Sequence, residues 1–253
     1  MNSFPKRIVS LSPDSSDILF RLGVGHLMVG VSAFAELPET YSKIPRVSGF
    51  DSANLKKVMS LKPDLVFVYS DVQAKFAEDL RKEGLNVIHT FQTSLDEIDQ
   101  VIALIGSTVG KTGEAESLIA EFRSIRTVRA FTKRPKIYFE EWDDPLISGI
   151  GWVGEMIELA GGRDIFPEKR KCKKASDRTV GADEVIQRNP DIILFSWCGK
   201  NGSVEEIKNR PGWEEISAVQ NNRIFEIESS KILQPSPVLM EGFEILRNII
   251  AIR

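Results

Sequence analysis

The feature of the sequence that most restricts its fold is a segment that occurs twice. Each copy has a short helical pattern, a Pro-Asp pair, and an apolar strand that ends in aromatic and hydroxyl residues; the copies span residues 54–70 and 183–197. Each half of the chain also opens with an apolar strand, the first from Arg7 and the second from Lys136. Two matched halves of alternating strands and helices predict two lobes with mainly parallel sheets wound on both faces by helices.

A helical pattern separates the two halves. Residues 111–134 contain a candidate N-cap at Thr112, acidic residues in the first turn, apolar residues at three- and four-residue spacing, and a basic end before Pro135. We therefore predict one long helix over 111–134 that joins an N-terminal α/β lobe (1–110) to a C-terminal α/β lobe (135–253). The predicted fold class is α/β, with two doubly wound lobes joined by this helix.

Charge and cysteine content restrict the partners. The formal net charge is -3, and the one basic run, residues 169–174, is followed by Ala-Ser-Asp and is interpreted as a solvated loop. The near-neutral charge gives no electrostatic case for nucleic acid as a partner. Separately, we expect a monomer. The two cysteines, Cys172 and Cys198, have no metal-binding spacing and form no disulfide framework, so we expect reduced thiols.

The amino-terminal sequence bears on the compartment. The first predicted strand begins at Arg7, and no apolar segment long enough for a signal peptide or a membrane span precedes it. The sequence as written therefore predicts a cytoplasmic protein. A periplasmic or extracytoplasmic protein is the alternative if a signal peptide has been removed.

The residues that follow the predicted strands indicate a binding site. Ligands of open parallel sheets bind beyond the carboxyl ends of the strands, and with two lobes the cleft between them is the expected place. Aromatic residues are frequent at these positions, which favours a large and partly apolar ligand, although such residues can also simply cover the ends of the sheets. The candidate stacking residues are Phe34, Phe50, Tyr69, Trp142, Trp152 and Trp197. The candidate polar contacts are Ser70, Glu141 and Lys231.

Residues that would support catalysis are few. His26 and His89 are the only histidines, and no nucleophile elbow, P-loop or dinucleotide-binding glycine motif follows a strand. Glu140 and Glu141 are adjacent on a predicted strand, so they point to opposite faces and cannot act as a carboxylate pair. The sequence predicts a binding protein that has no catalytic residue, no metal site and no covalently bound cofactor.

Four segments resemble a known family. They are residues 54–68 (NLKKVMSLKPDLVFV), residues 155–166 (EMIELAGGRDIF), Pro211-Gly-Trp213 and Val219–Arg223. With these segments the chain resembles the periplasmic-binding-protein-like family that serves ABC importers for cobalamin, ferric siderophores and heme. The resemblance extends over nearly the whole chain, and it implies two α/β lobes bridged by a single long helix.

Within that family, the chain is most similar to the cobalamin-binding branch, and closest to a subgroup that lacks signal peptides. The matching motifs are Glu141-Trp142-x-x-Pro145 before Gly151-Trp152, Cys198-Gly199, and Pro235-Ser-Pro237 before residues 241–246. The resemblance implies a corrinoid ligand, with an aromatic residue for stacking at Tyr69. The alternatives are a ferric siderophore, heme or another metal chelate, or an enzyme that acts on a corrinoid through Cys198 or Glu141.

Two positions depart from the cobalamin carriers. Ser230-Lys231 stand where the carriers have Asp and Trp, and Ala74-Lys75 stand at about the position of the glutamate that contacts the importer. The resemblance implies an ABC importer permease as partner, but this contact is not preserved. Binding without transfer to a transporter is therefore the alternative.

Overall fold

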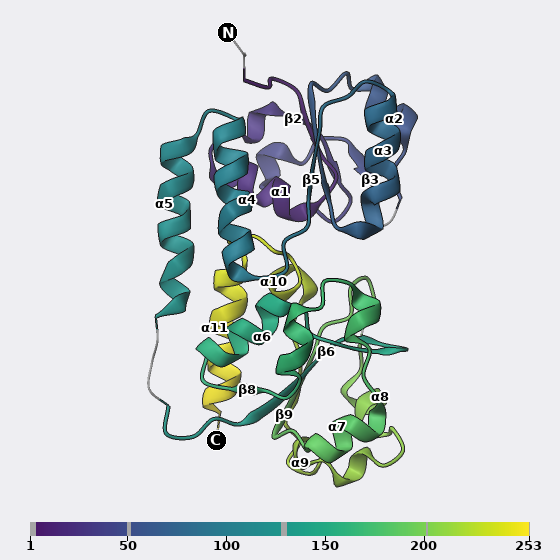
Figure 1. Cartoon of the computed structure of the whole chain (residues 1–253), viewed down its shortest axis with the longest axis vertical. Coiled ribbons are helices and arrows are strands. Elements are labelled where there is room, and N and C mark those ends of the chain that lie inside the picture. Colours follow the sequence, from purple (N-terminus) through teal and green to yellow (C-terminus); the bar gives the residue numbers. More distant parts are fainter. Residues whose placement is uncertain (1–3, 50–51, 128–130, 201, 253) are drawn as a thin grey trace. The chain divides into compact units, whose positions relative to one another are not determined.

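The computed structural model describes residues 4–49, 52–127, 131–200 and 202–252. The chain divides into two compact α/β units (Figure 1). The N-terminal unit comprises Met1–Gln92 and Asp96–Phe122, and the C-terminal unit comprises Thr93–Leu95 and Arg123–Arg253. No helix within the described ranges is long and apolar enough to cross a membrane.

The N-terminal unit is built on a five-stranded parallel sheet with the order β3-β2-β1-β4-β5. The strands are β1 (Ile8–Ser10), β2 (Met28–Ser32), β3 (Arg46–Ser48), β4 (Leu65–Tyr69) and β5 (Val87–Thr90). The central strands β1 and β4 pair in register from Ile8 and Leu65. Their side chains are buried except at Tyr69, as expected for apolar strands covered on both faces by helices.

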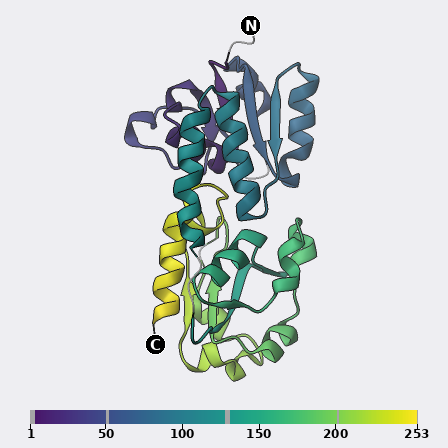
Figure 2. The same ribbon diagram turned by 60° about the vertical axis from the view of Figure 1, so that its left-hand side comes forward.

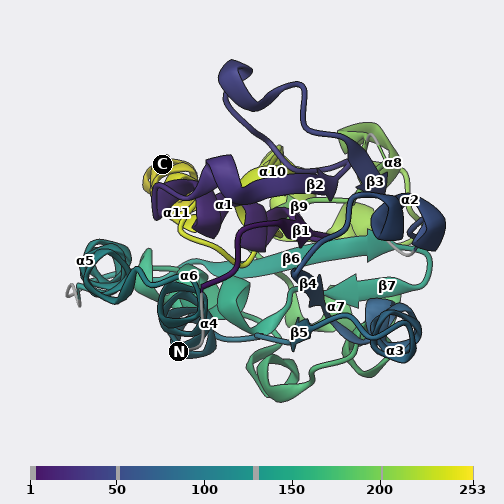
Figure 3. The ribbon, with the colours of Figure 1, turned by 90° about the horizontal axis from the view of Figure 1, so that it is seen from above.

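Helices cover both faces of this sheet. They are α1 (Pro13–Arg21), α2 (Leu55–Ser60), α3 (Ala74–Lys82), α4 (Leu95–Thr108) and α5 (Thr112–Arg123). Figures 1 and 3 show α2 and α3 on one side of the strands and α1 and α4 on the other. Val58 of α2 and Leu80 of α3 are buried in one apolar cluster with Val9 and Val66 of the sheet. α1 begins with Pro13, a residue suited to the first helical position because its missing N–H would have no partner there.

The helix predicted over residues 111–134 is shorter in the structure. α5 ends at Arg123, one 3-10 turn follows at Ser124–Arg126, and residues 131–135 are not helical. Thr127 is extended, and its branched Cβ disfavours continuing the helix. The Arg126 guanidinium donates to the backbone oxygen of Leu95 at 2.7 Å, which fixes the chain at this turn. Residues 128–130, also part of the predicted helix, lie outside the described residues.

The C-terminal unit contains a second, mainly parallel sheet with the order β10-β9-β6-β7. Its strands are β6 (Lys136–Asp143), β7 (Leu146–Ser148), β8 (Arg163–Asp164), β9 (Ile192–Phe195) and β10 (Ile224–Glu226). β8 and β9 pair with β6 in parallel, and β7 folds back on β6 as an antiparallel strand. The predicted fold class, α/β with two mainly parallel sheets, is confirmed.

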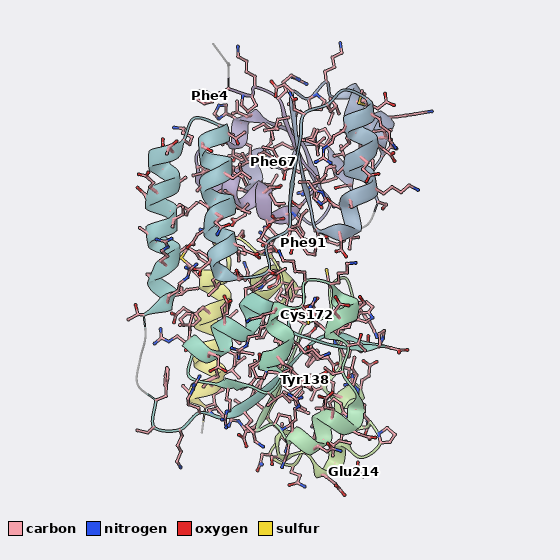
Figure 4. All side chains as sticks on the ribbon, in the orientation of Figure 1. Phe4, Phe67, Phe91, Tyr138, Cys172 and Glu214 are labelled. Carbon is pink, nitrogen blue, oxygen red and sulfur yellow. The ribbon has the colours of Figure 1, made fainter. Side chains whose placement is uncertain are left out.

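The core of the C-terminal unit collects large aromatic side chains. Its helices are α6 (Gly151–Leu159), α7 (Ala182–Arg188), α8 (Val204–Lys208), α9 (Ser217–Gln220), α10 (Ser229–Ile232) and α11 (Leu239–Ala251). Tyr138 of β6 lies inside this unit and is fully buried (Figure 4). Its ring contacts those of Phe166 and Trp213 edge-on. Trp213 is also fully buried, as expected of a structural anchor. Figure 2 shows α11, in yellow, running to the C-terminus along the outside of this unit.

Candidate functional site

Both sheets have a point where the strand order reverses, and these points direct attention to particular residues. In the N-terminal unit, β2 and β3 lie on one side of β1, and β4 and β5 lie on the other. In the C-terminal unit, β8 pairs with one edge of β6, and β9 and β10 lie on its other side. Ligands of open α/β sheets bind beyond the carboxyl ends of the strands that flank such a reversal. The positions to inspect are those after β1, β4, β6 and β9.

Hydroxyl groups and one carboxylate fill the turn from β1 into α1. The Ser10 hydroxyl lies 2.7 Å from that of Ser15 and 2.8 Å from that of Ser16. Asp14 is only 1% exposed, and its Oδ2 accepts a hydrogen bond from Nε2 of Gln92 at 2.9 Å. Burial raises the pKa of Asp14 to about 6, partly opposed by hydrogen bonds from Ser12 and Gln92. The pKa of this carboxyl group therefore lies closer to neutral pH than that of an exposed aspartate.

The end of β4 holds an aromatic side chain in a fixed place. The Tyr69 hydroxyl donates to the backbone oxygen of Gln92 at 3.2 Å, and the ring packs edge-on against Phe91 with the centroids 6.3 Å apart. The backbone N–H of Tyr69 donates to Oε1 of Gln73 at 3.1 Å. Two contacts of the side chain and one of the backbone thus fix Tyr69, whose ring is half-buried, at the carboxyl edge of the sheet.

The residue after Tyr69 has an uncommon backbone conformation. Ser70 has φ 60° and ψ 172°, a region that residues with a side chain rarely adopt. Such a conformation costs on the order of 1–3 kcal/mol and is concentrated at functional sites. The Ser70 carbonyl oxygen lies 2.7 Å from Nε2 of His89, and the Ser70 N–H donates to the Thr90 oxygen at 2.9 Å. Residues of β5 therefore hold both the carbonyl oxygen and the N–H of the strained residue.

Phe34 follows β2 and is exposed over 46% of its surface. The preceding residue, Ala33, lines a cavity of about 600 Å³ together with residues of β3, residues 49 and 52–54, and Lys57 of α2. Two cations, Arg46 and Lys57, belong to this lining, together with the hydroxyls of Ser48 and Ser52. No acidic side chain is among the described residues of the lining. Phe50, the other predicted aromatic here, lies outside the described residues.

The carboxylates of β6 are held by arginines. Glu140 is fully buried and accepts two hydrogen bonds from Arg210, at 2.6 and 2.8 Å, and a third from Nε1 of Trp197 at 3.1 Å. Burial raises the pKa of Glu140, and the hydrogen bonds and charge of Arg210 oppose the rise. Glu141 pairs in the same bidentate way with the buried Arg178, at 2.5 and 2.8 Å. The two adjacent carboxylates thus bind different arginines, and neither acts on the other.

The other predicted residues of the C-terminal unit are also held within it. Trp152 and Trp197 are 2% and 3% exposed, and Nε1 of Trp152 donates to the Ile232 oxygen at 2.9 Å. Trp142 is partly exposed, packs against the same apolar cluster as Trp197, and donates from Nε1 to the Asp144 oxygen at 3.0 Å. The Lys231 ammonium lies 2.9 Å from the Glu241 carboxylate.

The surroundings of the candidate reactive groups favour neither catalysis nor metal binding. Cys198 is a free, half-buried thiol, and burial together with the negative charge of Glu141 raises its pKa, which disfavours the reactive thiolate. Within the described ranges, no group of three or more His, Cys, Asp or Glu side chains could hold a metal ion. A cavity of about 1660 Å³ lies at the opposite, amino-terminal ends of the strands of the C-terminal unit, where Arg134, Asp191 and Arg223 are among the residues that line it. None of the predicted site residues lines it.

Several residues of these sites were not among the sequence candidates. They are Asp14, Gln73, Gln92, Arg46, Lys57, Arg178 and Arg210. Asp14 and Gln92 do follow strands, and this position was the available signal. Arg178 lies 37 residues from Glu141 in the sequence, and Arg210 lies 70 residues from Glu140. No spacing in the sequence indicates such pairs.

A family described as "Periplasmic binding protein" matches residues 8–230 of the chain. The match covers most of the sequence and both sheets, so the chain belongs to the periplasmic binding protein family. The resemblance seen in the sequence is confirmed at this level.

Three relatives illustrate the range of the family. The uncharacterized ABC transporter substrate-binding lipoprotein YvrC of Bacillus subtilis (strain 168) is 28% identical over 95% of this chain and 78% of its own length. The vitamin B12-binding protein of Vibrio vulnificus (strain YJ016) is 25% identical over 94% of this chain and 88% of its own. A solved structure from Staphylococcus epidermidis ATCC 12228, described as a possible iron-binding (periplasmic solute-binding) protein, has a TM-score of 0.82 at 27% identity and covers 98% of this chain and 100% of that one.

Proposed function

We propose that this protein is the substrate-binding component of an ABC importer and that its ligand is a corrinoid of the cobalamin type. The observation that carries the proposal is the Tyr69–Ser70 end of β4. A tyrosine fixed by two side-chain contacts and one backbone contact, and followed by a strained residue, lies where open α/β sheets bind ligands. Relatives that are named for vitamin B12 binding or for ABC transport support this assignment. The protein acts by binding and not as an enzyme.

The proposed contacts differ in how directly they touch the ligand. Phe34, Tyr69 and Trp142 have exposed or partly exposed rings and supply stacking surfaces. Ser70 supplies polar groups beside Tyr69, and Phe50 remains a proposed contact from its position in the sequence. Trp152 and Trp197 are buried, so they support the surface from behind. Glu141 and Lys231 contribute polar contacts while they remain paired with Arg178 and Glu241.

Calorimetric titration of the protein with cyanocobalamin tests the proposal. The wild type is expected to bind, and Tyr69→Ala is expected to weaken binding by about 1–3 kcal/mol because a stacking face is lost. Tyr69→Phe is the matched control: it keeps the ring and removes the hydroxyl, so its loss should be smaller. Absence of heat at high micromolar cyanocobalamin, with the folded protein verified by circular dichroism, would rule out the corrinoid assignment.

A second ligand class has its own structural support. Arg46 and Lys57 line the cavity of about 600 Å³ in the N-terminal unit, in which the described residues include no acidic side chain. Two cations with hydroxyl neighbours suit a ligand with carboxylate or other anionic donors, such as a ferric siderophore or heme. Titration with hemin and with a ferric citrate or hydroxamate complex, alongside cyanocobalamin, separates the classes. A preference for an anionic chelate that Arg46→Gln abolishes would assign the protein to this second class.

The proposed partner is an ABC importer permease, and transport places the protein on the outer side of the membrane that contains this permease. Fractionation of host cells with an antibody to the protein tests the location. Recovery in the cytoplasm would support the alternative of a binding protein that serves no transporter. A monomer is expected in solution, and light scattering measures it.

A further inference from the structure

Asp14 is a buried carboxyl group with only neutral hydrogen-bond donors. Its burial costs free energy in the ionised form unless a cation or several donors compensate. The donors that act on it are the amide of Gln92, the hydroxyl of Ser12 and backbone N–H groups. No cation among the described residues pairs with it, and its Oδ1 is buried without a hydrogen bond from them.

Other titratable groups occur on the elements around Asp14. On α1 itself, Asp17 forms an ion pair with Arg21 at 2.9 Å. On β5, the ring of His89 is hydrogen-bonded to the Ser70 oxygen at 2.7 Å. Tyr69 stands at the end of β4. None of these groups is among the causes that shift the pKa of Asp14, which are burial and neutral donors.

A chain of contacts leads from Asp14 to the ring proposed to stack on the ligand. The side-chain amide of Gln92 donates to Asp14 at 2.9 Å, and the backbone oxygen of the same residue accepts from the Tyr69 hydroxyl at 3.2 Å. Gln92 therefore connects the buried carboxyl group directly to Tyr69. On its other side, Tyr69 is fixed through Gln73, whose Nε2 donates to the Leu11 oxygen at 3.0 Å.

The protonation state of Asp14 changes what it offers to Gln92. The Gln92 amide donates to Asp14 and this bond favours the carboxylate, whereas burial, the larger effect, favours the protonated group. A charged Asp14 in this setting also favours any rearrangement that admits water. We propose that Asp14 and Gln92 form a proton-linked positioning pair for Tyr69, so that loss of one buried proton loosens Tyr69 and lowers affinity for the ligand. The inference rests on the proposed function for its effect on binding, and on the hydrogen bonds alone for its effect on Tyr69.

The first experiment measures cyanocobalamin affinity from pH 5 to pH 8. For the wild type, affinity is expected to fall about five- to twentyfold over this range, a coupling of ordinary size between two linked sites. Asp14→Asn removes the titration and should give a flat profile. Asp17→Asn, one turn further along α1, and His89→Gln are the matched controls, and both should follow the wild type. A wild-type slope that persists in Asp14→Asn, or that disappears in His89→Gln, would overturn the proposal.

The second experiment needs no ligand. Carbon-13 NMR follows the Asp14 carboxyl carbon, assigned with Asp14→Asn, and the ring resonances of Tyr69 in the same pH titration. The Tyr69 signals are expected to shift with the midpoint of Asp14. In Gln92→Met, Asp14 should still titrate while the Tyr69 signals stay constant, because the connecting residue has lost its amide.

Together, the two experiments distinguish failure of the corrinoid assignment from failure of the positioning pair. If cyanocobalamin binds at no pH but Tyr69 still follows Asp14, the corrinoid assignment fails and the positioning pair stands. If Asp14 titrates while Tyr69 does not respond, the positioning pair is wrong whatever the ligand. Gln92→Met also covers the case in which Asp14→Asn does not fold.

Discussion

The two units each bury a carboxylate near the carboxyl end of their central strand, but they compensate its charge differently. In the C-terminal unit, Glu140 takes two hydrogen bonds from Arg210 and one from Trp197. In the N-terminal unit, Asp14 has hydroxyls, backbone groups and the amide of Gln92. Burial raises the pKa of both, and only Glu140 has a cation that opposes the rise. The C-terminal carboxylate is thus part of a fixed ion pair, whereas the N-terminal one has only neutral hydrogen-bond donors.

The largest effect in this comparison is expected from removing the cation of the C-terminal unit. Arg210→Met leaves Glu140 buried without a counter-charge and also removes the guanidinium that lies 4.5 Å from the Trp213 ring centre. Loss of one partner of a buried pair typically costs about 3–5 kcal/mol, so the free energy of unfolding should fall by about that amount in urea denaturation.

An exposed pair in the same unit provides the control. Arg247 and Glu244 are three residues apart on α11, and such pairs contribute about 1 kcal/mol or less. Arg247→Met should therefore change stability little. Equal losses in Arg210→Met and Arg247→Met would contradict the distinction between a buried, fixed pair and a solvated one.

The next largest effect is expected at Asp14, where a substitution should raise the free energy of unfolding instead of lowering it. Its pKa in the folded protein, about 6, lies above the ordinary value of 3.8, so the folded state binds this proton more tightly than the unfolded state. Stability from this group is therefore present below about pH 4 and is lost as pH rises through about 6. A shift of this size corresponds to at most about 3 kcal/mol at pH 7.5, and Asp14→Asn should stabilise the protein by up to that amount.

The comparison with the wild type must be made at several pH values. Glu158 and Glu168, whose pKa values arginine contacts lower, stabilise the fold at neutral pH and lose that contribution in acid. The difference in unfolding free energy between Asp14→Asn and wild type isolates the one group. That difference should rise from pH 4 to pH 7, and a constant difference would show that Asp14 is not protonated in the folded protein.

Much of the fold could be predicted from the sequence because each strand or helix depends mainly on residues that are close together in the chain. The apolar run of residues 65–69 is β4 itself, and the strand predicted from Arg7 is β1, beginning at Ile8. The Pro-Asp repeat located the matched strands β4 and β9. The end of α5 was predicted too late, because the apolar spacing continues to Ile125 although the helix stops at Arg123. Periodicity reports which face is buried, and it does not report where the backbone leaves the helix.

The sequence allowed the positions of the candidate site residues to be predicted, but not the side chains that contact them. Tyr69 ends a strand and Ser70 follows it, and both could be named from that position alone. Glu141 was predicted as a polar contact because it follows a predicted strand. Nothing in the sequence indicates that Arg178 binds it. Asp14 lies inside the first turn of α1, which starts at Pro13, and nothing in the sequence indicates that it is buried there. Side-chain pairs between distant segments depend on the packed fold, and a single sequence does not contain that information.

A smaller effect is expected where the strands β4 and β9 end. Ser70 has a positive φ, and Ser196, which follows β9, is not among the positive-φ residues of the described chain. Glycine adopts positive φ without steric cost, so Ser70→Gly should stabilise the N-terminal unit by about 1 kcal/mol after its higher entropy in the unfolded chain is allowed for. Ser196→Gly should instead destabilise by about 0.5–1 kcal/mol. Thermal unfolding of both variants measures this, and a loss of stability in Ser70→Gly would show that the serine side chain matters more than the strain.

The smallest effects are expected at the helices that precede the two Pro-Asp pairs. Asn54 caps α2, its Oδ1 accepting from the Lys57 N–H at 2.9 Å, whereas α7 begins after Gly181, which has no side chain to cap it. Asn54→Ala should therefore cost about 1 kcal/mol. Gly181 has φ -86° and ψ 146°, and a Cβ there would approach nothing closer than the Glu184 Cβ at 4.0 Å, so Gly181→Ser fits and should add a few tenths of a kcal/mol. Urea midpoints of the two variants and the wild type resolve these changes, and a destabilised Gly181→Ser would mean that the repeat differs at this position for a reason other than capping.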